Sequence, residues 1–349
     1  MEPLLEPTPQ GLYCKAGGFH VDPWSPVDRA IVSHAHSDHA REGSKAYLTS
    51  QSGRDLLALR VGSDAPIETL RYGETRTLGE VTVSLHPAGH ILGSSQVRLE
   101  CGGEVWVFSG DYKRQLDPTC EPFEPQRCHT FITEATFALP IYRWSEPEET
   151  FDEINAWWRA NQAAGRTSVI FAYALGKAQH VLAGLDPEIG PIAAHGMVGR
   201  YVPAYAAAGV VLPEVRRVER SNIADLRGRA VVLATPSVLR TPWLDQLEPF
   251  STAFASGWMQ IRGARRRRAV DRGFALSDHA DWGDLIRTIR ETKAERIGVT
   301  HGYTATLARW LQENQWNAFT VPTQFEGELQ AEADEVGAAA EGTGAGSAA

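Results

Sequence analysis

The segment of residues 33–40 limits what this chain can fold into more than any other part of it. It reads SHAHSDHA, and its first residue ends the run RAIVS (residues 29–33), which has the composition of a buried β-strand. A strand that ends in HxHxDH carries three imidazoles and one carboxylate into a tight loop. Four such side chains within six positions are costly to bury without a cation, because each loses its hydration. The segment therefore predicts a metal centre, with one pair of side chains on each of two ions about 3.5–4 Å apart.

Two more ligand candidates follow in order along the chain. His90 lies in PAGHILGS and Asp111 lies in FSGDY, and each comes after a strand-like run and beside a glycine. Glycine lets the backbone approach a crowded centre. Alone, each residue has an ordinary alternative, a turn histidine and an Asx-turn aspartate. Beside the first motif, we interpret both as metal ligands.

The rest of the chain is typical of an α/β protein with an insertion. Thr150–Glu153 has a capping-box pattern and predicts a helix that ends near Gly165, followed by a strand and a helix from Lys177. We interpret residues 145–262 as an inserted α/β unit. Short β-type runs are expected before it, and a strand and two helices after it, at residues 29–33, 81–85, 96–100, 104–108, 130–133, 281–292, 296–300 and 304–313.

Composition sets limits on partners and location. The formal net charge of −9 argues, at face value, against a polyanionic substrate. However, residues 326–349 hold six acidic residues and no basic one, and we predict them to be a disordered tail. The chain has no signal-like start and no uncharged apolar run near the ~18 residues that span a bilayer. Its four cysteines form no CxxC pair. We expect a cytoplasmic protein with no membrane partner.

Together these motifs resemble the metallo-β-lactamase superfamily, whose fold is an αββα sandwich with a dinuclear site at one edge. The resemblance implies two Zn²⁺ ions, with Mn²⁺ also tolerated by nitrogen and oxygen ligands. It implies that His34, His36 and His90 hold one ion, Asp38 and His39 hold the second, and Asp111 holds both. It also implies a last histidine downstream, and His301 in VTHGY fits it.

The long interval between Asp111 and His301 resembles the β-CASP branch of that superfamily, nucleases with an α/β cap domain inserted before the final motifs. Glu134 in TEATF fits motif A, His279 in SDHAD fits motif B, and His301 fits motif C. Asp22 in FHVD fits the aspartate that supports the ligands. The resemblance implies a catalytic domain in residues 1–144 and 263–325 and a cap in 145–262. It also implies catalytic roles for Asp22, Asp38, Glu134 and His279.

Within the branch, GGFHVDPW, PAGHILGSS, ALGKAQ, SGWM and GFALSDHADW are most similar to bacterial ligase-associated DNA exonucleases. This implies hydrolysis of phosphodiester bonds in DNA that is single-stranded or has accessible ends, in repair with an ATP-dependent DNA ligase and a helicase. A histidine at motif C is typical of RNA-processing members, so an RNA-processing nuclease is the alternative. A small-ester or thioester hydrolase is a third reading, against which the cap and motifs A and B argue.

Substrate contacts are expected where basic residues gather near these motifs. The run GARRRR contains Arg265, Arg266, Arg267 and Arg268 at the end of the predicted cap, where the run could line a groove for a phosphate backbone. Its alternative is a solvated face. Lys177 begins a predicted helix, where it could meet a phosphate, or it is an ordinary exposed lysine. We expect His279 to act as a general acid whose ring is held by Glu134.

Overall fold

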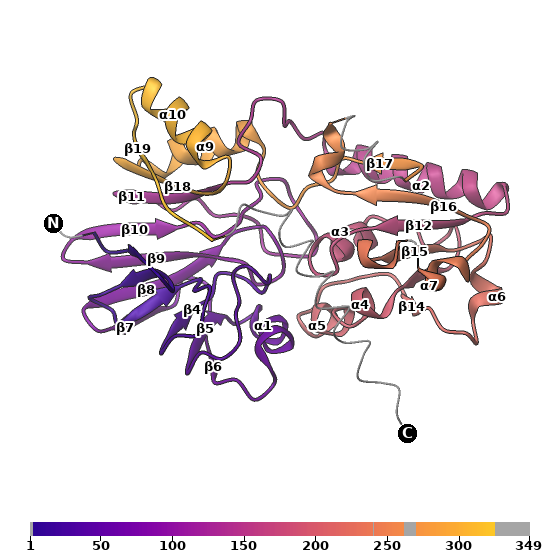
Figure 1. The fold of residues 1–349 in the computed structure, drawn as a ribbon, viewed down its shortest axis with the longest axis horizontal. Coiled ribbons are helices and arrows are strands. Elements are labelled where there is room, and N and C mark those ends of the chain that lie inside the picture. The colour runs from indigo at the N-terminus through magenta and orange to yellow at the C-terminus, as the bar shows by residue number, and fades with distance from the viewer. Residues whose placement is uncertain (1–2, 240, 262–269, 325–349) are drawn as a thin grey trace. The chain divides into compact units, whose positions relative to one another are not determined.

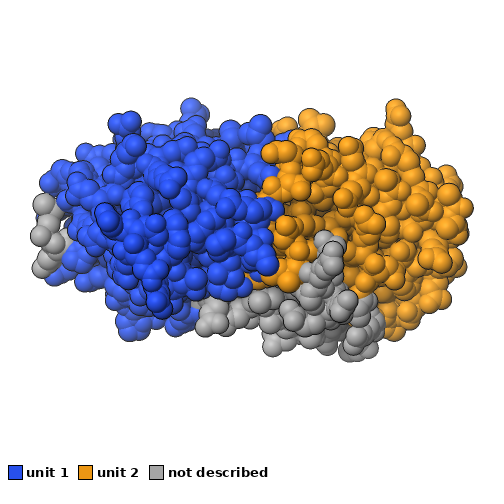
Figure 2. Space-filling model, turned by 90° about the horizontal axis from the view of Figure 1, so that it is seen from above, with its two compact units in different colours: residues 1–143, 279–331 blue, residues 144–278, 332–349 orange. Residues whose placement is uncertain are grey.

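The computed structural model describes residues 3–239, 241–261 and 270–324 (Figure 1). The chain divides into two compact units (Figure 2): unit 1 is residues 1–143 and 279–331, and unit 2 is residues 144–278 and 332–349. The arginines at 265–268 and the segment 326–349, for which a groove and a disordered tail were expected, lie outside the described residues. Unit 1 has two sheets and unit 2 has one, and each unit has its own apolar core.

The first sheet of unit 1 is built almost in chain order. Its strands β1 to β3 are antiparallel and β3 to β6 are parallel. Helix α1 (Arg54–Val61) follows β5. In sheet order the strands are β1 (Glu6–Thr8), β2 (Gly11–Cys14), β3 (Phe19–Val21), β4 (Ala30–Ile31), β5 (Tyr47–Ser50) and β6 (Ile67–Leu70).

The second sheet of unit 1 combines an antiparallel half with a parallel half. Strands β7 to β10 form a meander, and β10, β11, β18 and β19 run parallel. In sheet order the strands are β19 (Asn317–Thr320), β18 (Arg296–Gly302), β11 (Thr130–Ala135), β10 (Glu104–Phe108), β9 (Ser95–Cys101), β8 (Val81–Pro87) and β7 (Thr75–Leu78). The apolar runs expected at 81–85, 96–100, 104–108 and 130–133 all lie in these strands.

Three apolar clusters set the order of layers in unit 1. Val21 of the first sheet and Val83 of the second share one core between the two sheets. Helices α9 (Trp282–Thr292) and α10 (Thr304–Glu313) cover the other face of the second sheet, and α1 packs on the first sheet. The order is therefore helix, sheet, sheet, helix. This mixed α/β architecture is consistent with the metallo-β-lactamase-type fold that the motifs predicted.

Unit 2 is built on one parallel sheet. In sheet order its strands are β14 (Arg216–Arg217), β13 (Ile192–Ala194), β15 (Val231–Ala234), β12 (Thr167–Phe171), β16 (Phe250–Ala255) and β17 (Arg272–Phe274). Its helices are α2 (Pro147–Ala163), α3 (Lys177–Ala183), α4 (Gly196–Gly199), α5 (Val202–Ala207), α6 (Ile223–Leu226) and α7 (Pro242–Asp245). Strand β17 pairs with β16, and the first segment of unit 2 runs from Trp144 to Asp278.

The predicted start of the first helix of unit 2 was wrong. Helix α2 begins at Pro147, with Glu146 as the residue before it, so Thr150 lies inside the helix and is buried. Proline suits the first helical position, because its fixed φ is already helical and its missing N–H has no partner to lose there. No helix of the described residues is both long enough and apolar enough to cross a membrane.

Candidate metal centre

Four separate stretches of unit 1 supply the candidate ligands. The 34–39 loop follows β4, His90 follows β8, Asp111 follows β10, and His301 lies in β18. Within the first loop, Ala40 N–H donates to the His36 carbonyl oxygen at 2.9 Å, so a tight turn folds the loop back on itself. Residues that are far apart in the sequence thus meet beside the strand ends of two sheets.

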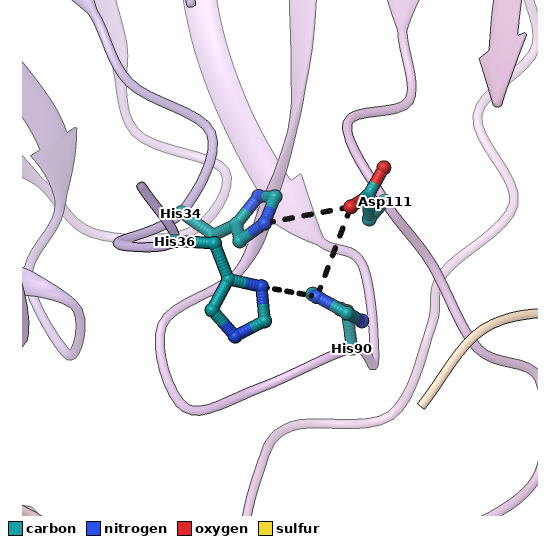
Figure 3. Close-up of side chains that lie close together, drawn as sticks. All are labelled: His34, His36, His90 and Asp111. Atoms are coloured by element: carbon teal, nitrogen blue, oxygen red, sulfur yellow. Dashed lines mark hydrogen bonds and ion pairs between the residues drawn. The ribbon is translucent and has the colours of Figure 1, made fainter. Parts of the chain in front are cut away.

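The first group of ligand atoms gathers around one oxygen of Asp111 (Figure 3). His34 Nε2 lies 3.6 Å from Asp111 Oδ2, and His90 Nε2 lies 3.9 Å from the same oxygen. His36 Nδ1 is 3.0 Å from His90 Nε2. One ligand atom from each of these four residues lies within 4.8 Å of the others. The structure therefore brings together all four residues that were predicted to surround one ion.

A second group shares the same aspartate. His39 Nε2 lies 3.3 Å from Asp111 Oδ2 and 3.7 Å from Asp38 Oδ2. The His301 ring stacks on the His39 ring, with centroids 4.8 Å apart and planes 16° from parallel. Asp38, His39 and His301 form a cluster with ligand atoms within 4.8 Å. Asp111 thus lies between two groups of side chains, as a residue shared by two ions would.

Two residues behind the histidines fix the orientation of their rings. Asp22 Oδ2 lies 2.7 Å from His39 Nδ1, and Ser33 Oγ lies 3.0 Å from His34 Nδ1. Ser33 also donates from its backbone N–H and its hydroxyl to Asp22, at 2.7 and 2.5 Å. Such partners on Nδ1 direct Nε2 of a ligand histidine toward the metal. Ser33 was not predicted, although its place directly before His34 is the signal that could have indicated it.

The polar atoms at the centre fit a cation. Among the described residues, His34 Nε2, His39 Nε2 and Asp111 Oδ1 are buried and have no hydrogen-bond partner. Buried polar atoms are rarely left without one, because losing water without a replacement costs free energy. Imidazole nitrogens and carboxylate oxygens without sulfur suit zinc or manganese. The donor set therefore matches a divalent metal.

The histidines and aspartates of the cluster shift one another's pKa values. Burial by itself would lower the pKa of His39, but Asp111, Asp38 and Asp22 together raise that pKa well above its usual range. Burial works in the opposite sense on Asp111, whose pKa is nevertheless held well below its usual range, chiefly by His39. Burial and the neighbouring His39 lower the pKa of His34. His39 and Asp111 thus each favour the charged form of the other within the buried cluster.

A separate pair lies next to these groups. His279 Nδ1 is 3.0 and 3.1 Å from the two carboxylate oxygens of Glu134, and both residues are buried. The Tyr112 backbone N–H donates to Glu134 Oε1 at 2.7 Å, which fixes the carboxylate. The centroids of the His279 and His90 rings lie 4.6 Å apart. The predicted partners His279 and Glu134 are therefore adjacent, with one ring edge of His279 held by the carboxylate.

Gly110 is required by the approach of Asp111 to the first loop. Its φ is +56°, and an added Cβ would lie 2.8 Å from the Cβ of Ser33. Both the backbone conformation and the contact exclude other residues at this position. The glycine before Asp111 in the sequence is thus explained by the crowding of the two loops that carry the ligands.

Lys177, which was expected to meet a phosphate or to be an ordinary exposed lysine, is placed differently. Lys177 begins α3, but its side chain is fully buried and its Nζ lies 3.0 Å from Asp278 Oδ2. In this position the ammonium group is directed to a carboxylate of unit 2 and away from solvent.

His86 lies four residues before His90, in β8, and its Nε2 is 3.0 Å from Ser84 Oγ.

No family model matches the chain, but several known proteins are similar to it in sequence. A probable DNA ligase of Opitutus terrae is 31% identical over 314 residues, covering 89% of this chain and 30% of that protein. The endoribonuclease ysh-1 of Neurospora crassa is 25% identical over 222 residues, covering 52% of this chain and 25% of that protein. The chain therefore spans less than a third of the length of each.

Among solved structures, a protein of unknown function from Enterococcus faecalis V583 has a similar fold, with a TM-score of 0.58 and 12% identity. The match covers 86% of this chain and 80% of that one. The chain and its relatives fit the metallo-β-lactamase superfamily and its β-CASP branch.

Proposed function

We propose that this protein is a metal-dependent nuclease that hydrolyses phosphodiester bonds in DNA, as an exonuclease that trims ends for a DNA ligase. The observation that carries the proposal is the convergence of His34, His39 and His90 on one oxygen of Asp111, next to the His279–Glu134 pair. Several relatives support a nuclease by name, among them an endoribonuclease and an RNase J-like protein. The relative named as a probable DNA ligase supports DNA as the substrate.

In this proposal two Zn²⁺ ions, or Mn²⁺, are held by His34, His36, His90, Asp38, His39, His301 and Asp111. When bound, such ions neutralise phosphate oxygens and lower the pKa of water so that it attacks near neutral pH. The protein's own residues orient the ligands and limit the access of water. Asp22 and Ser33 orient the ligand rings, and the low exposure of the cluster keeps bulk water away from it.

We assign the general acid to His279. Its Nδ1 is held by Glu134, so Nε2 lies on the opposite edge of the ring and can give a proton to the leaving oxygen. The carboxylate favours the protonated imidazole, because an adjacent negative charge stabilises the positive form. We further propose that unit 2 is the β-CASP cap and that Arg265, Arg266, Arg267 and Arg268 contact the DNA backbone, working with a ligase and a helicase in repair.

An RNA-processing nuclease is the second candidate, favoured by the endoribonuclease among the relatives and by a histidine, His301, at motif C. The test is cleavage of single-stranded DNA and RNA of matched sequence, labelled at either end, with Zn²⁺ or Mn²⁺. Degradation of DNA from its ends supports the proposal, whereas cleavage of RNA with DNA left intact favours the second candidate. Turnover of thioesters or lactones without cleavage of either nucleic acid would indicate a small-molecule hydrolase.

A further inference from the structure

Three residues beyond Asp111, the side chain of Arg114 reaches the helix that follows His279. Arg114 Nη1 lies 2.8 Å from Thr288 Oγ1 and 2.7 Å from Glu291 Oε2. Thr288 and Glu291 are three residues apart on α9, so they share one face of the helix. Only 11% of the Arg114 side chain is exposed, so water competes weakly with these contacts. A charged hydrogen bond with limited exposure is stronger than one on the open surface.

The Arg114 side chain has little freedom to move. Its guanidinium group lies 4.8 Å from the centroid of the Phe123 ring, and Phe123 lies 5.1 Å from the Tyr112 ring. A guanidinium group that is stacked on a ring and bound to two acceptors is held in one orientation. Arg114 therefore acts as a rigid link between the Asp111 loop and α9.

A second contact joins the same two segments through their main chains. The Ala280 N–H donates to the Tyr112 carbonyl oxygen at 2.7 Å, and the Tyr112 N–H donates to Glu134. The peptide groups of Tyr112 thus touch both the loop of His279 and the carboxylate that holds its ring. Asp281 then caps α9, accepting from Asp284 N–H at 2.9 Å, so the helix starts three residues after His279.

We propose that Arg114 is a positioning residue that fixes His279 relative to Asp111 by clamping α9 to the Asp111 loop. The role in turnover rests on the proposed nuclease function, but the clamp itself does not. Without Arg114, the Ala280 hydrogen bond and the apolar packing of α9 against Tyr112 remain, but the charged contact between the loop and the helix is lost, so the ring of His279 gains freedom. A general acid must meet the leaving oxygen within hydrogen-bond distance, so a small displacement lowers the rate and leaves binding unchanged.

The first test measures backbone amide exchange of the full-length, zinc-loaded protein at Ala280. Arg114→Ala is expected to raise the Ala280 exchange rate about ten-fold, because this hydrogen bond opens locally when the clamp is lost. The matched control is Arg309→Ala, which removes an exposed arginine paired with Glu313 on α10 and is expected to leave Ala280 unchanged. Unchanged exchange at Ala280 in Arg114→Ala would overturn the proposal. If Arg114→Ala does not fold, Glu291→Gln removes the charged acceptor and is expected to act in the same direction.

The second test separates positioning from general stability by kinetics. Arg114→Ala is expected to lower kcat about ten-fold at constant KM and constant metal content, and Arg114→Lys to recover part of that loss. In a His279→Ala background the same substitution is expected to have no further effect. An equal loss of kcat in both backgrounds would show that Arg114 does not act through His279. A wild-type protein without nuclease activity would refute the proposed function. The exchange experiment would still show whether Arg114 holds α9 to the Asp111 loop.

Discussion

His279 Nδ1 lies 3.0 Å from Glu134 Oε2, and these two residues are 145 positions apart in the chain. The pair forms because β11 carries Glu134 beside β18, while the loop before α9 returns His279 to the same end of the sheet. Glu134 is itself fixed by the Tyr112 N–H. Tyr112, which directly follows Asp111, therefore links the Glu134–His279 pair to Asp111.

Replacing His279 should separate catalysis from metal binding. His279→Ala is expected to lower kcat by about 10²- to 10⁴-fold, the usual contribution of a general acid, with two metal ions per chain retained. Glu134→Gln should cause a smaller loss, because the ring stays in place but loses the neighbouring charge. Steady-state cleavage and elemental analysis of the same samples measure both effects. Loss of metal in His279→Ala would identify this residue as a ligand.

Asp22 is expected to control metal affinity without touching the metal. Asp22→Asn keeps the size of the side chain but weakens its hydrogen bond with His39 Nδ1. Partners of this kind typically contribute about 10- to 100-fold in affinity. Competition with a chelator measures the change. Asp28→Asn, which alters an exposed aspartate paired with Lys45, is the matched control and should bind metal as the wild type does.

Gly110→Ala should destabilise the protein and its ligand loops together. The new Cβ would meet Ser33 at 2.8 Å, and the backbone φ of +56° is unfavourable for alanine. We expect a loss of about 2–4 kcal/mol in the free energy of unfolding, typical of steric overlap at a strained position. Urea unfolding measures it. Gly102→Ala has a similar φ of +57° but open space around the Cβ, so it should cost clearly less.

His86 should make stability depend on pH. Burial, followed by the charge of Arg98, lowers the pKa of His86 to about 4, against about 6.5 for an unfolded histidine. Since the unfolded chain binds this proton more readily, stability is complete above pH ~6.5 and falls as the pH drops toward ~4. His86→Gln should flatten this part of the curve. Urea midpoints of both proteins at several pH values, with the same metal content, test the expectation, and parallel curves would contradict it.

The local chemistry of the site was predictable from the sequence, while its supporting contacts were not. HxHxDH, His90, Asp111 and His301 each follow or lie within an apolar run, so their type and place suggested the cluster that the structure contains. Arg114 bonds to residues 174 and 177 positions away, and no local pattern marks such a contact. Lys177 is a second contact that no local pattern marks. A lysine at a helix start is typical of an exposed position, yet Lys177 pairs in the interior with Asp278, 101 positions later.

The most direct test of the account is cleavage of end-labelled single-stranded DNA by chelator-stripped protein as zinc or manganese is added back. Activity should be absent without metal and should rise to a plateau at two ions per chain, with Asp111→Ala inactive throughout. Activity that is complete without added metal, or equal in Asp111→Ala, would contradict the central claim that His34, His39 and His90 converge on Asp111 to form a catalytic metal centre.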